Sequence, residues 1–330
     1  MRDQSFPGLP GKLRFAFAAG LTLLLWLCQQ SWSLPPRQPS STPPPSKTDS
    51  RSSTLLITVR TKDGASVGLS TADLQIKVDG KTALIQQIRH VTGLPLDYTI
   101  LIDNSGSERI HLEAHKVEGT EFLSKVVQPG RDHGMLVNFN DQAYVDADSA
   151  NPQDLVNALA KSSARGGTAL YDAVVACADG ISKNEDARND EEKDSSYAPL
   201  RLMFILSDGE DNSSHVTLDA AIQAALRAGI RIYAIGESPD PNRAHNTARA
   251  TSTLKEFAQR TGGKVYLTGK DQDTTKIAAD IADELTNLFA VSYTAPQQKS
   301  DGQLHKLELK SNKKGVSITA PDRYFAPTTE

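Results

Sequence analysis

Residues 98–107 have the sequence YTILIDNSGS, an apolar run that ends in Asp103 and is followed by two serines. Such a run predicts a strand buried on both faces, as in a parallel sheet covered by helices. A second apolar run, LRLMFILS at 200–207, ends in the same way directly before Asp208. The two runs together indicate a fold that gathers acidic side chains at one edge of a sheet.

Around these runs, the region 96–289 alternates apolar strands with amphipathic segments. Helices are expected at 108–127, 153–161, 168–182, 217–228, 251–261 and 274–289. This alternation predicts an α/β fold, a doubly wound, Rossmann-like domain with a mostly parallel central sheet. The runs GMLVNF and QAYVDA are separated only by a tight turn at Asn140 and Asp141, so the second run is expected to be an antiparallel edge strand.

The flanking regions 54–95 and 290–326 contain short strand-like runs, among them TLLITVR, LQIKV and LHKLELKS. The segment from Ser70 to Asp73 is a loose capping box and predicts a single helical turn. Neither region has enough apolar residues to form a core alone. We therefore expect the two to pair as one small antiparallel β-sandwich, formed by N- and C-terminal strands.

The first 33 residues are typical of a targeting segment. Arg2, Lys12 and Arg14 precede an apolar run from Phe15 to Cys28, and residues 31–33 offer a small-x-small cleavage signal. Export to the periplasm or beyond is the first interpretation. The run is shorter than the roughly 20 residues that a spanning helix needs, so an uncleaved segment tethered to the inner membrane is the alternative. Residues 34–53 form a linker rich in proline and serine. Residues 184–196 contain six acidic residues, two basic residues and no large apolar side chain, so they are expected to form a mobile surface insertion.

Composition excludes several classes of function. The net charge is -4 and no basic stripe occurs, so the sequence does not indicate a nucleic-acid partner. The only two cysteines are Cys28 and Cys177, which excludes a disulfide framework. Cys177 lies in an apolar helical pattern and is interpreted as a small buried hydrophobic residue.

Three segments suggest a metal site. The Asp-x-Ser-x-Ser pattern at 103–107 is also common in turns, but Gly166-Gly167-Thr168 opens another predicted helix, and Asp208 ends another strand. Ligands of doubly wound sheets bind where the winding direction reverses, and both aspartates are expected there. The candidate ligands supply only oxygen atoms, which suits Mg²⁺ first and Mn²⁺ or Ca²⁺ as alternatives; they are Asp103, Ser105, Ser107, Thr168 and Asp208.

This pattern resembles the metal-ion-dependent adhesion site of von Willebrand factor A (VWA) domains. Over about 55–325 the chain also resembles a secreted bacterial VWFA-related family first found in acidobacteria. The segments that carry this second resemblance are LSTADLQIKVDGK, GGTALYDAV, LSDGEDNSS, IRIYAIG and DGQLHKLELK. The chain departs from the family at Glu108, where many relatives carry Met. We interpret Glu108 as lying outside the ligand set and adding negative charge at the rim.

The resemblance implies a non-enzymatic protein-binding or adhesion module whose cation accepts an acidic residue of a partner protein. No small-molecule substrate is implied. A Mg²⁺-dependent hydrolase that uses Asp103 or a serine as nucleophile is an alternative, although the sequence shows no G-x-S-x-G elbow, Walker-type loop or Asp-x-Asp motif. A purely structural metal, with binding through the β-sandwich, is a third interpretation.

Other polar residues near these motifs have simpler interpretations. Asp141 is expected to serve the hairpin turn, and Asp172 to be a surface or helix-start charge. The loop residues Glu210, Asp211 and Asn212 either steer a partner or only keep the loop solvated. His111 and His115 share a helical face but lack a third ligand, which disfavours a zinc site.

Overall fold

The computed structural model describes residues 53–61, 67–188, 198–237, 244–268, 273–295 and 301–326. The predicted targeting segment and almost all of the predicted linker lie outside the described residues, as does most of the predicted acidic insertion. The beginning of that insertion is helical instead, because helix α3 continues to Arg188. Within the described ranges, no helix has both the length and the hydrophobicity needed to cross a membrane.

The central sheet is mixed and six-stranded, with the order β10-β9-β8-β5-β6-β7. Its strands are β5 (Leu96–Asp103), β6 (His133–Phe139), β7 (Ala143–Ser149), β8 (Leu200–Leu206), β9 (Arg231–Glu237) and β10 (Val265–Thr268). All neighbours in this sheet pair in parallel except β6 and β7, which form an antiparallel hairpin at the edge. The predicted fold class and the antiparallel edge strand are therefore confirmed.

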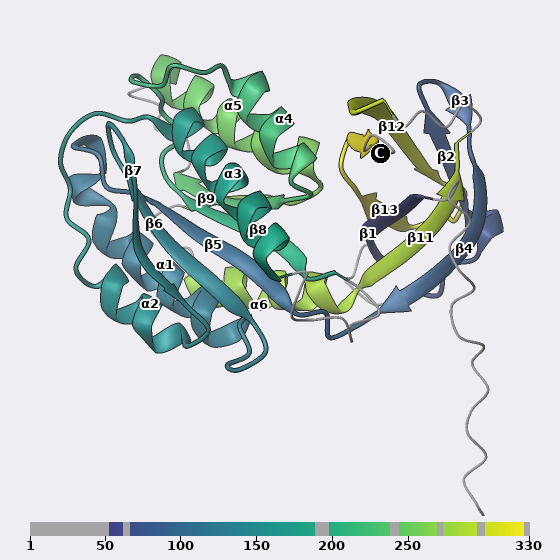
Figure 1. The fold of residues 1–330 in the computed structure, drawn as a ribbon, viewed down its shortest axis with the longest axis horizontal. Helices are drawn as coiled ribbons and strands as arrows, with labels where there is room; N and C mark the ends of the chain where they lie inside the picture. Colours follow the sequence, from purple (N-terminus) through teal and green to yellow (C-terminus); the bar gives the residue numbers. More distant parts are fainter. Residues whose placement is uncertain are drawn as a thin grey trace, which may run out of the picture. The chain divides into compact units, whose positions relative to one another are not determined.

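Helices cover both faces of this sheet (Figure 1). One face carries α1 (Leu112–Lys125), α2 (Pro152–Leu159) and α6 (Thr274–Thr286), and the other carries α3 (Leu170–Arg188), α4 (Leu218–Arg227) and α5 (Ala244–Thr261). The two apolar layers account for the continuous apolar strands, because each strand contributes side chains to both. Cys177 is buried among the second set of helices, as expected for a small hydrophobic residue.

Several predicted helix boundaries are wrong, and the helix expected at 251–261 begins seven residues earlier, at Ala244. The helix expected at 108–127 starts as a separate 3-10 turn, η2 (Ser107–Ile110), before α1 begins at Leu112. The helix expected to reach 289 ends at Thr286, because strand β11 (Leu288–Thr294) begins immediately after it. The residues at 288–291 are all buried, and a short apolar run of this kind fits a helix or a strand equally well.

The flanking strands form two further sheets. One has the order β13-β1-β11-β4, from β1 (Ser53–Thr61), β4 (Leu84–Val91), β11 and β13 (Val316–Thr319). The other has the order β14-β12-β2-β3, from β2 (Leu74–Val78), β3 (Lys81–Thr82), β12 (Gln303–Ser311) and β14 (Arg323–Ala326). Each sheet combines strands from both ends of the chain, and their buried side chains share one apolar cluster. The antiparallel unit expected from the sequence is thus present.

The predicted helical turn between the first strands is also present as η1 (Thr71–Asp73). The Asp73 carboxylate accepts hydrogen bonds from the Ser70 backbone N–H at 2.9 Å and from the Ser70 hydroxyl at 2.6 Å.

The topology determines where ligands of the central sheet would gather. Strand β5 pairs with β6 on one side and with β8 on the other, and Ile102 is opposite Leu206 in the β5–β8 register. Asp103, the last residue of β5, and Asp208, just after the end of β8, therefore lie at adjacent strand ends, where the winding direction reverses.

Candidate metal centre

The Asp-x-Ser-x-Ser loop is held in place by Asp103, the last residue of β5. Its side chain is completely buried. One carboxylate oxygen accepts the Ser105 backbone N–H at 2.9 Å, and the other accepts the Ser207 hydroxyl at 2.7 Å. The hydroxyls of Ser105 and Ser107 lie 3.0 Å apart and so belong to one polar group. Ser207 has no counterpart among the residues predicted from sequence, although it directly precedes Asp208.

The Gly-Gly-Thr loop lies directly against this first loop. The Gly106 N–H donates to the Gly166 carbonyl at 3.0 Å, and Asp141 accepts the Gly167 N–H at 2.9 Å. Gly166 has a φ of +78°, and a Cβ placed there would lie 2.4 Å from an Asp141 carboxylate oxygen. Asp141 therefore does more than complete the hairpin turn, because it also anchors the loop that carries Thr168.

The loop after Asp208 holds Thr168 from the other side. The Thr168 N–H donates to the Asn212 side chain at 2.9 Å, and the Thr168 carbonyl accepts the Asn212 N–H, also at 2.9 Å. Asp211 accepts the Tyr171 N–H at 3.0 Å at the start of α3. Asp211 and Asn212 therefore do more than keep the loop solvated, because they fasten two of the candidate metal loops together.

Three carboxylates converge at this point. Asp103, Glu108 and Asp208 each offer one carboxylate oxygen within 4.8 Å of the others. Ligands of one Mg²⁺ ion at 2.0–2.1 Å would lie about 3 to 4 Å apart, so this separation is of the right order for a shared cation. The prediction that Glu108 lies at the rim is wrong, because its side chain is completely buried and its carboxylate accepts the Asp208 N–H at 3.1 Å.

These carboxylates repel one another in a poorly solvated place. Burial, followed by the charge of Glu108, raises the pKa of Asp208 to about 8, and the same two causes raise the pKa of Asp103 to about 6. Burial also acts against the charged form of Glu108, but the hydrogen bond and charge of His115 outweigh it and lower the pKa of Glu108. A divalent cation would supply the missing positive charge, so the donor set fits a hard metal ion.

These pKa shifts predict how metal and pH act together on stability. The pKa values of both aspartates are raised, so folding of the cation-free protein favours their protonated forms. The folded state is therefore most stable, as far as these two groups are concerned, below about pH 4. Its stability falls as the pH rises through about 6 and about 8 and the two carboxyls lose their protons. A bound cation should reverse this loss, and Mg²⁺ should raise the melting temperature more at pH 8.5 than at pH 5.5. Thermal melts in Mg²⁺ and in chelator at both pH values check this. The same increment at both would contradict it.

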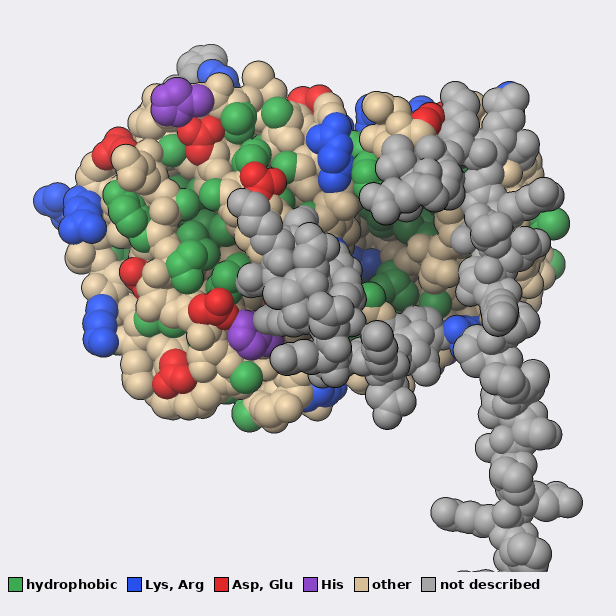
Figure 2. Space-filling model, in the orientation of Figure 1, with side chains coloured by type: hydrophobic (Ala, Val, Ile, Leu, Met, Phe, Trp, Pro, Cys, Tyr) green, Lys and Arg blue, Asp and Glu red, His purple; other side chains and the backbone are tan. Residues whose placement is uncertain are grey.

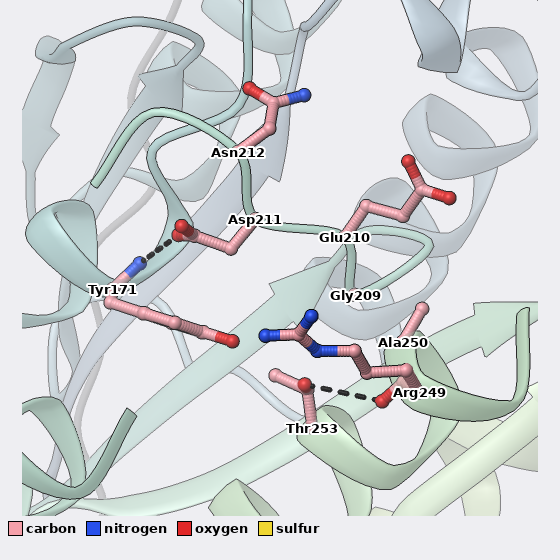
Figure 3. Close-up of a pocket in the computed structure, with 8 residues that line it drawn as sticks. All are labelled: Tyr171, Gly209, Glu210, Asp211, Asn212, Arg249, Ala250 and Thr253. Atoms are coloured by element: carbon pink, nitrogen blue, oxygen red, sulfur yellow. Dashed lines mark hydrogen bonds between the residues drawn. The ribbon is translucent and has the colours of Figure 1, made fainter. Parts of the chain in front are cut away.

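A pocket of about 220 Å³ lies beside the metal loops, lined by Tyr171, Gly209, Glu210, Asp211, Asn212, Arg249, Ala250 and Thr253. Figure 3 shows the Arg249 guanidinium pointing toward the Tyr171 ring, while the Glu210 side chain points away. The sequence did not draw attention to Arg249, because a single arginine on a helix carries no motif.

The remaining candidates lie outside the carboxylate group. Asp172 accepts the backbone N–H groups of His215 and Val216, each at 3.0 Å, and so holds the start of α3 to the loop before α4. His111 pairs with Glu237. Both ring nitrogens of His115 contact carboxylates, so these two histidines do not form a metal pair.

Comparison with solved structures gives distant likenesses. A von Willebrand factor type A protein from Catenulispora acidiphila is 16% identical, with 86% of this chain and 75% of that chain covered and a TM-score of 0.43. BatB from Bacteroides thetaiotaomicron is 15% identical, with 57% and 98% covered and a TM-score of 0.42. Proximal thread matrix protein 1 from the mussel byssus, in a structure with a zinc-occupied MIDAS motif, is 18% identical, with 62% and 48% covered and a TM-score of 0.42. No curated protein matches the chain.

A sequence model of the von Willebrand factor type A domain matches residues 97–277. The match covers more than half of the 330 residues, begins in β5 and ends in α6. It includes all three loops of the candidate centre. The chain therefore belongs to the von Willebrand factor type A domain family.

Proposed function

We propose that this chain is a non-enzymatic binding module that acts outside the cytoplasm and captures an acidic residue of a partner protein through a divalent cation. Mg²⁺ is the first candidate for the ion, and Mn²⁺ or Ca²⁺ are alternatives. The residues proposed to hold it are Asp103, Ser105, Ser107, Thr168 and Asp208. The observation that carries the proposal is the convergence of three carboxylates, two of them buried, beside two serine hydroxyls at the switch point of the sheet.

The charge of this set explains why the partner should be acidic. Two aspartates neutralise a divalent ion, and hydroxyl ligands add no charge, so the ion stays able to attract a further carboxylate. On the face drawn in Figure 2, acidic and basic side chains of the described residues are interspersed. We therefore expect attraction of the partner to be local to the ion rather than spread over a basic surface.

The pocket beside the centre offers a second contact for the same partner. Gly209, one of the residues that line the pocket, directly follows Asp208 in the sequence, and Arg249 faces into the pocket. A partner that places one carboxylate on the ion could place a second acidic group, or the polar end of a neighbouring side chain, against this guanidinium.

The hydrogen bonds at the centre favour binding over hydrolysis. The hydroxyls of Ser105 and Ser107 are bonded to one another, whereas a serine nucleophile needs a neighbouring base. The nearby ring of His115 is held between two glutamates. Location outside the cytoplasm rests on the targeting segment alone, and would be tested by recovering the processed chain from the periplasm.

Thr168→Ala is expected to weaken binding of an acidic partner at least tenfold while leaving the fold intact. Thr168 would supply only a neutral hydroxyl, from a loop already fixed by backbone contacts to Asn212, so its removal should cost on the order of 1 kcal/mol of stability. The probe is a peptide carrying one Asp or Glu, selected from an array by binding wild type in Mg²⁺ and not in chelator.

The matched control is Thr99→Ala, which removes a completely buried threonine from the same sheet, on β5. It should bind the selected peptide like wild type. Equal affinity of Thr168→Ala and wild type would show that the metal face is not the binding face, and would favour a structural metal instead.

A further inference from the structure

A buried row of acidic and histidine side chains continues from the metal centre into the protein. Glu108, His115 and Glu118 have exposed fractions of 0%, 3% and 4%. The His115 Nε2 lies 2.8 Å from a Glu108 carboxylate oxygen, and its Nδ1 lies 2.8 Å from Glu118. All three residues belong to the 3-10 turn η2 and helix α1 that follow the Asp-x-Ser-x-Ser loop.

Both oxygens of the Glu108 carboxylate have defined partners. One accepts the Asp208 backbone N–H at 3.1 Å, and the other contacts His115. These contacts hold the carboxylate close to those of Asp103 and Asp208, within the 4.8 Å separation given above. Glu108 directly follows the Asp-x-Ser-x-Ser loop, and the backbone N–H of Asp208, in a different metal loop, helps to hold it in place.

Buried charged side chains are not the most stabilising way to fill the interface between a helix and a sheet. Removing charged groups from water costs several kcal/mol for each ion, and well-packed apolar residues of similar volume are often at least as stable. Packing alone therefore gives no reason for a carboxylate at position 108. A cation beside the other two carboxylates would supply one.

We propose that Glu108 is the third carboxylate of the metal centre, with His115 and the Asp208 N–H as the groups that position it. This inference rests on the proposed metal site and adds to it a residue from outside the five-residue set. The third carboxylate strengthens the hold on the cation, since it adds negative charge within a few ångströms of the ion. The Glu108 side chain is completely buried, whereas that of Asp208 is partly exposed. With three carboxylates the set carries one net negative charge, so a partner carboxylate would be held by direct coordination at the exposed side of the centre rather than by long-range attraction.

The test measures Mn²⁺ binding to Glu108→Gln and to wild type by calorimetry, using the full chain. Glutamine has almost the same shape and can still accept the Asp208 N–H, so the variant removes mainly the charge. We expect the Kd for Mn²⁺ to rise about tenfold or more. The matched control is Glu113→Gln on the same helix, whose side chain is 83% exposed, and its Kd should equal that of wild type.

A second variant keeps the test decisive if Glu108→Gln does not fold. Glu108→Asp retains the charge but withdraws it by one methylene, and we expect it also to weaken Mn²⁺ binding severalfold. Melting in chelator shows which variants are folded. A folded Glu108 variant that binds Mn²⁺ as tightly as wild type would overturn this inference alone. No saturable binding by folded wild type would instead overturn the metal site itself.

Discussion

Asp208→Asn is expected to weaken cation binding at least 100-fold, with no loss of stability in the cation-free protein at pH 8. The carboxylate faces those of Asp103 and Glu108, and its pKa is already raised to about 8 by burial and by the charge of Glu108. Removing its charge therefore relieves repulsion when no ion is bound. When an ion is bound, the same change removes one of the anionic ligands that hold it. Asparagine can still accept the Glu210 N–H that Asp208 accepts at 2.8 Å, so the loop should keep its shape.

The measurement combines Mn²⁺ titration with thermal melting in chelator. The matched control is Asp179→Asn, which removes an exposed carboxylate from α3 and should change neither quantity. If Asp208→Asn bound Mn²⁺ as wild type does, Asp208 would not be a ligand. If it were much less stable in chelator at pH 8, the carboxylate would have a structural role that this account does not include.

Gly209→Ala is expected to lower the melting temperature by on the order of 10 °C. Gly209 follows Asp208 directly, has a φ of +84°, and would place a Cβ 2.4 Å from the backbone oxygen of Ala250 on α5. The positive φ costs about 1 kcal/mol for alanine, and the collision with helix backbone adds roughly 2 kcal/mol more, since neither side can rotate away. At about 2 to 4 °C for each kcal/mol, the total corresponds to the stated shift.

The control for Gly209→Ala isolates the collision. Gly229→Ala also changes a glycine with positive φ, +66°, but its Cβ would have no heavy atom within 4 Å. It should lower the melting temperature by only a few degrees. If the two variants had the same melting temperature, the close approach of α5 to the metal loop would have no energetic significance. The loop would then be free to move relative to that helix.

The sequence predicted those parts of the site whose position follows from strand ends. Asp103 and Asp208 each follow an apolar run, and in a doubly wound sheet the ends of the first strand and of its parallel partner must meet. The edge hairpin at β6 and β7 was predictable for a similar reason, because only an antiparallel pair can be joined by so short a turn. Pairing of the strands of 54–95 with those of 290–326 was predictable because neither region has enough apolar residues to form a core by itself.

The parts that the sequence did not predict depend on tertiary contacts. Glu108 was expected at the rim because a charged residue is rarely buried without a partner, and its partner His115 lies seven residues further on. The anchoring role of Asp141 could not be foreseen, because Gly167 is far from it in sequence. The boundary between α6 and β11 was misplaced because the residues around Phe289 are buried and apolar, whichever element they form.

The most direct test of the central claim is a calorimetric titration of folded wild-type protein with Mg²⁺ and with Mn²⁺ at pH 8, beside the Asp103→Asn/Asp208→Asn double variant. The account predicts one saturable site in wild type and none in the double variant, with both proteins folded by their melting curves. A folded wild-type protein without a saturable site, or a double variant that binds the ion equally well, would contradict it.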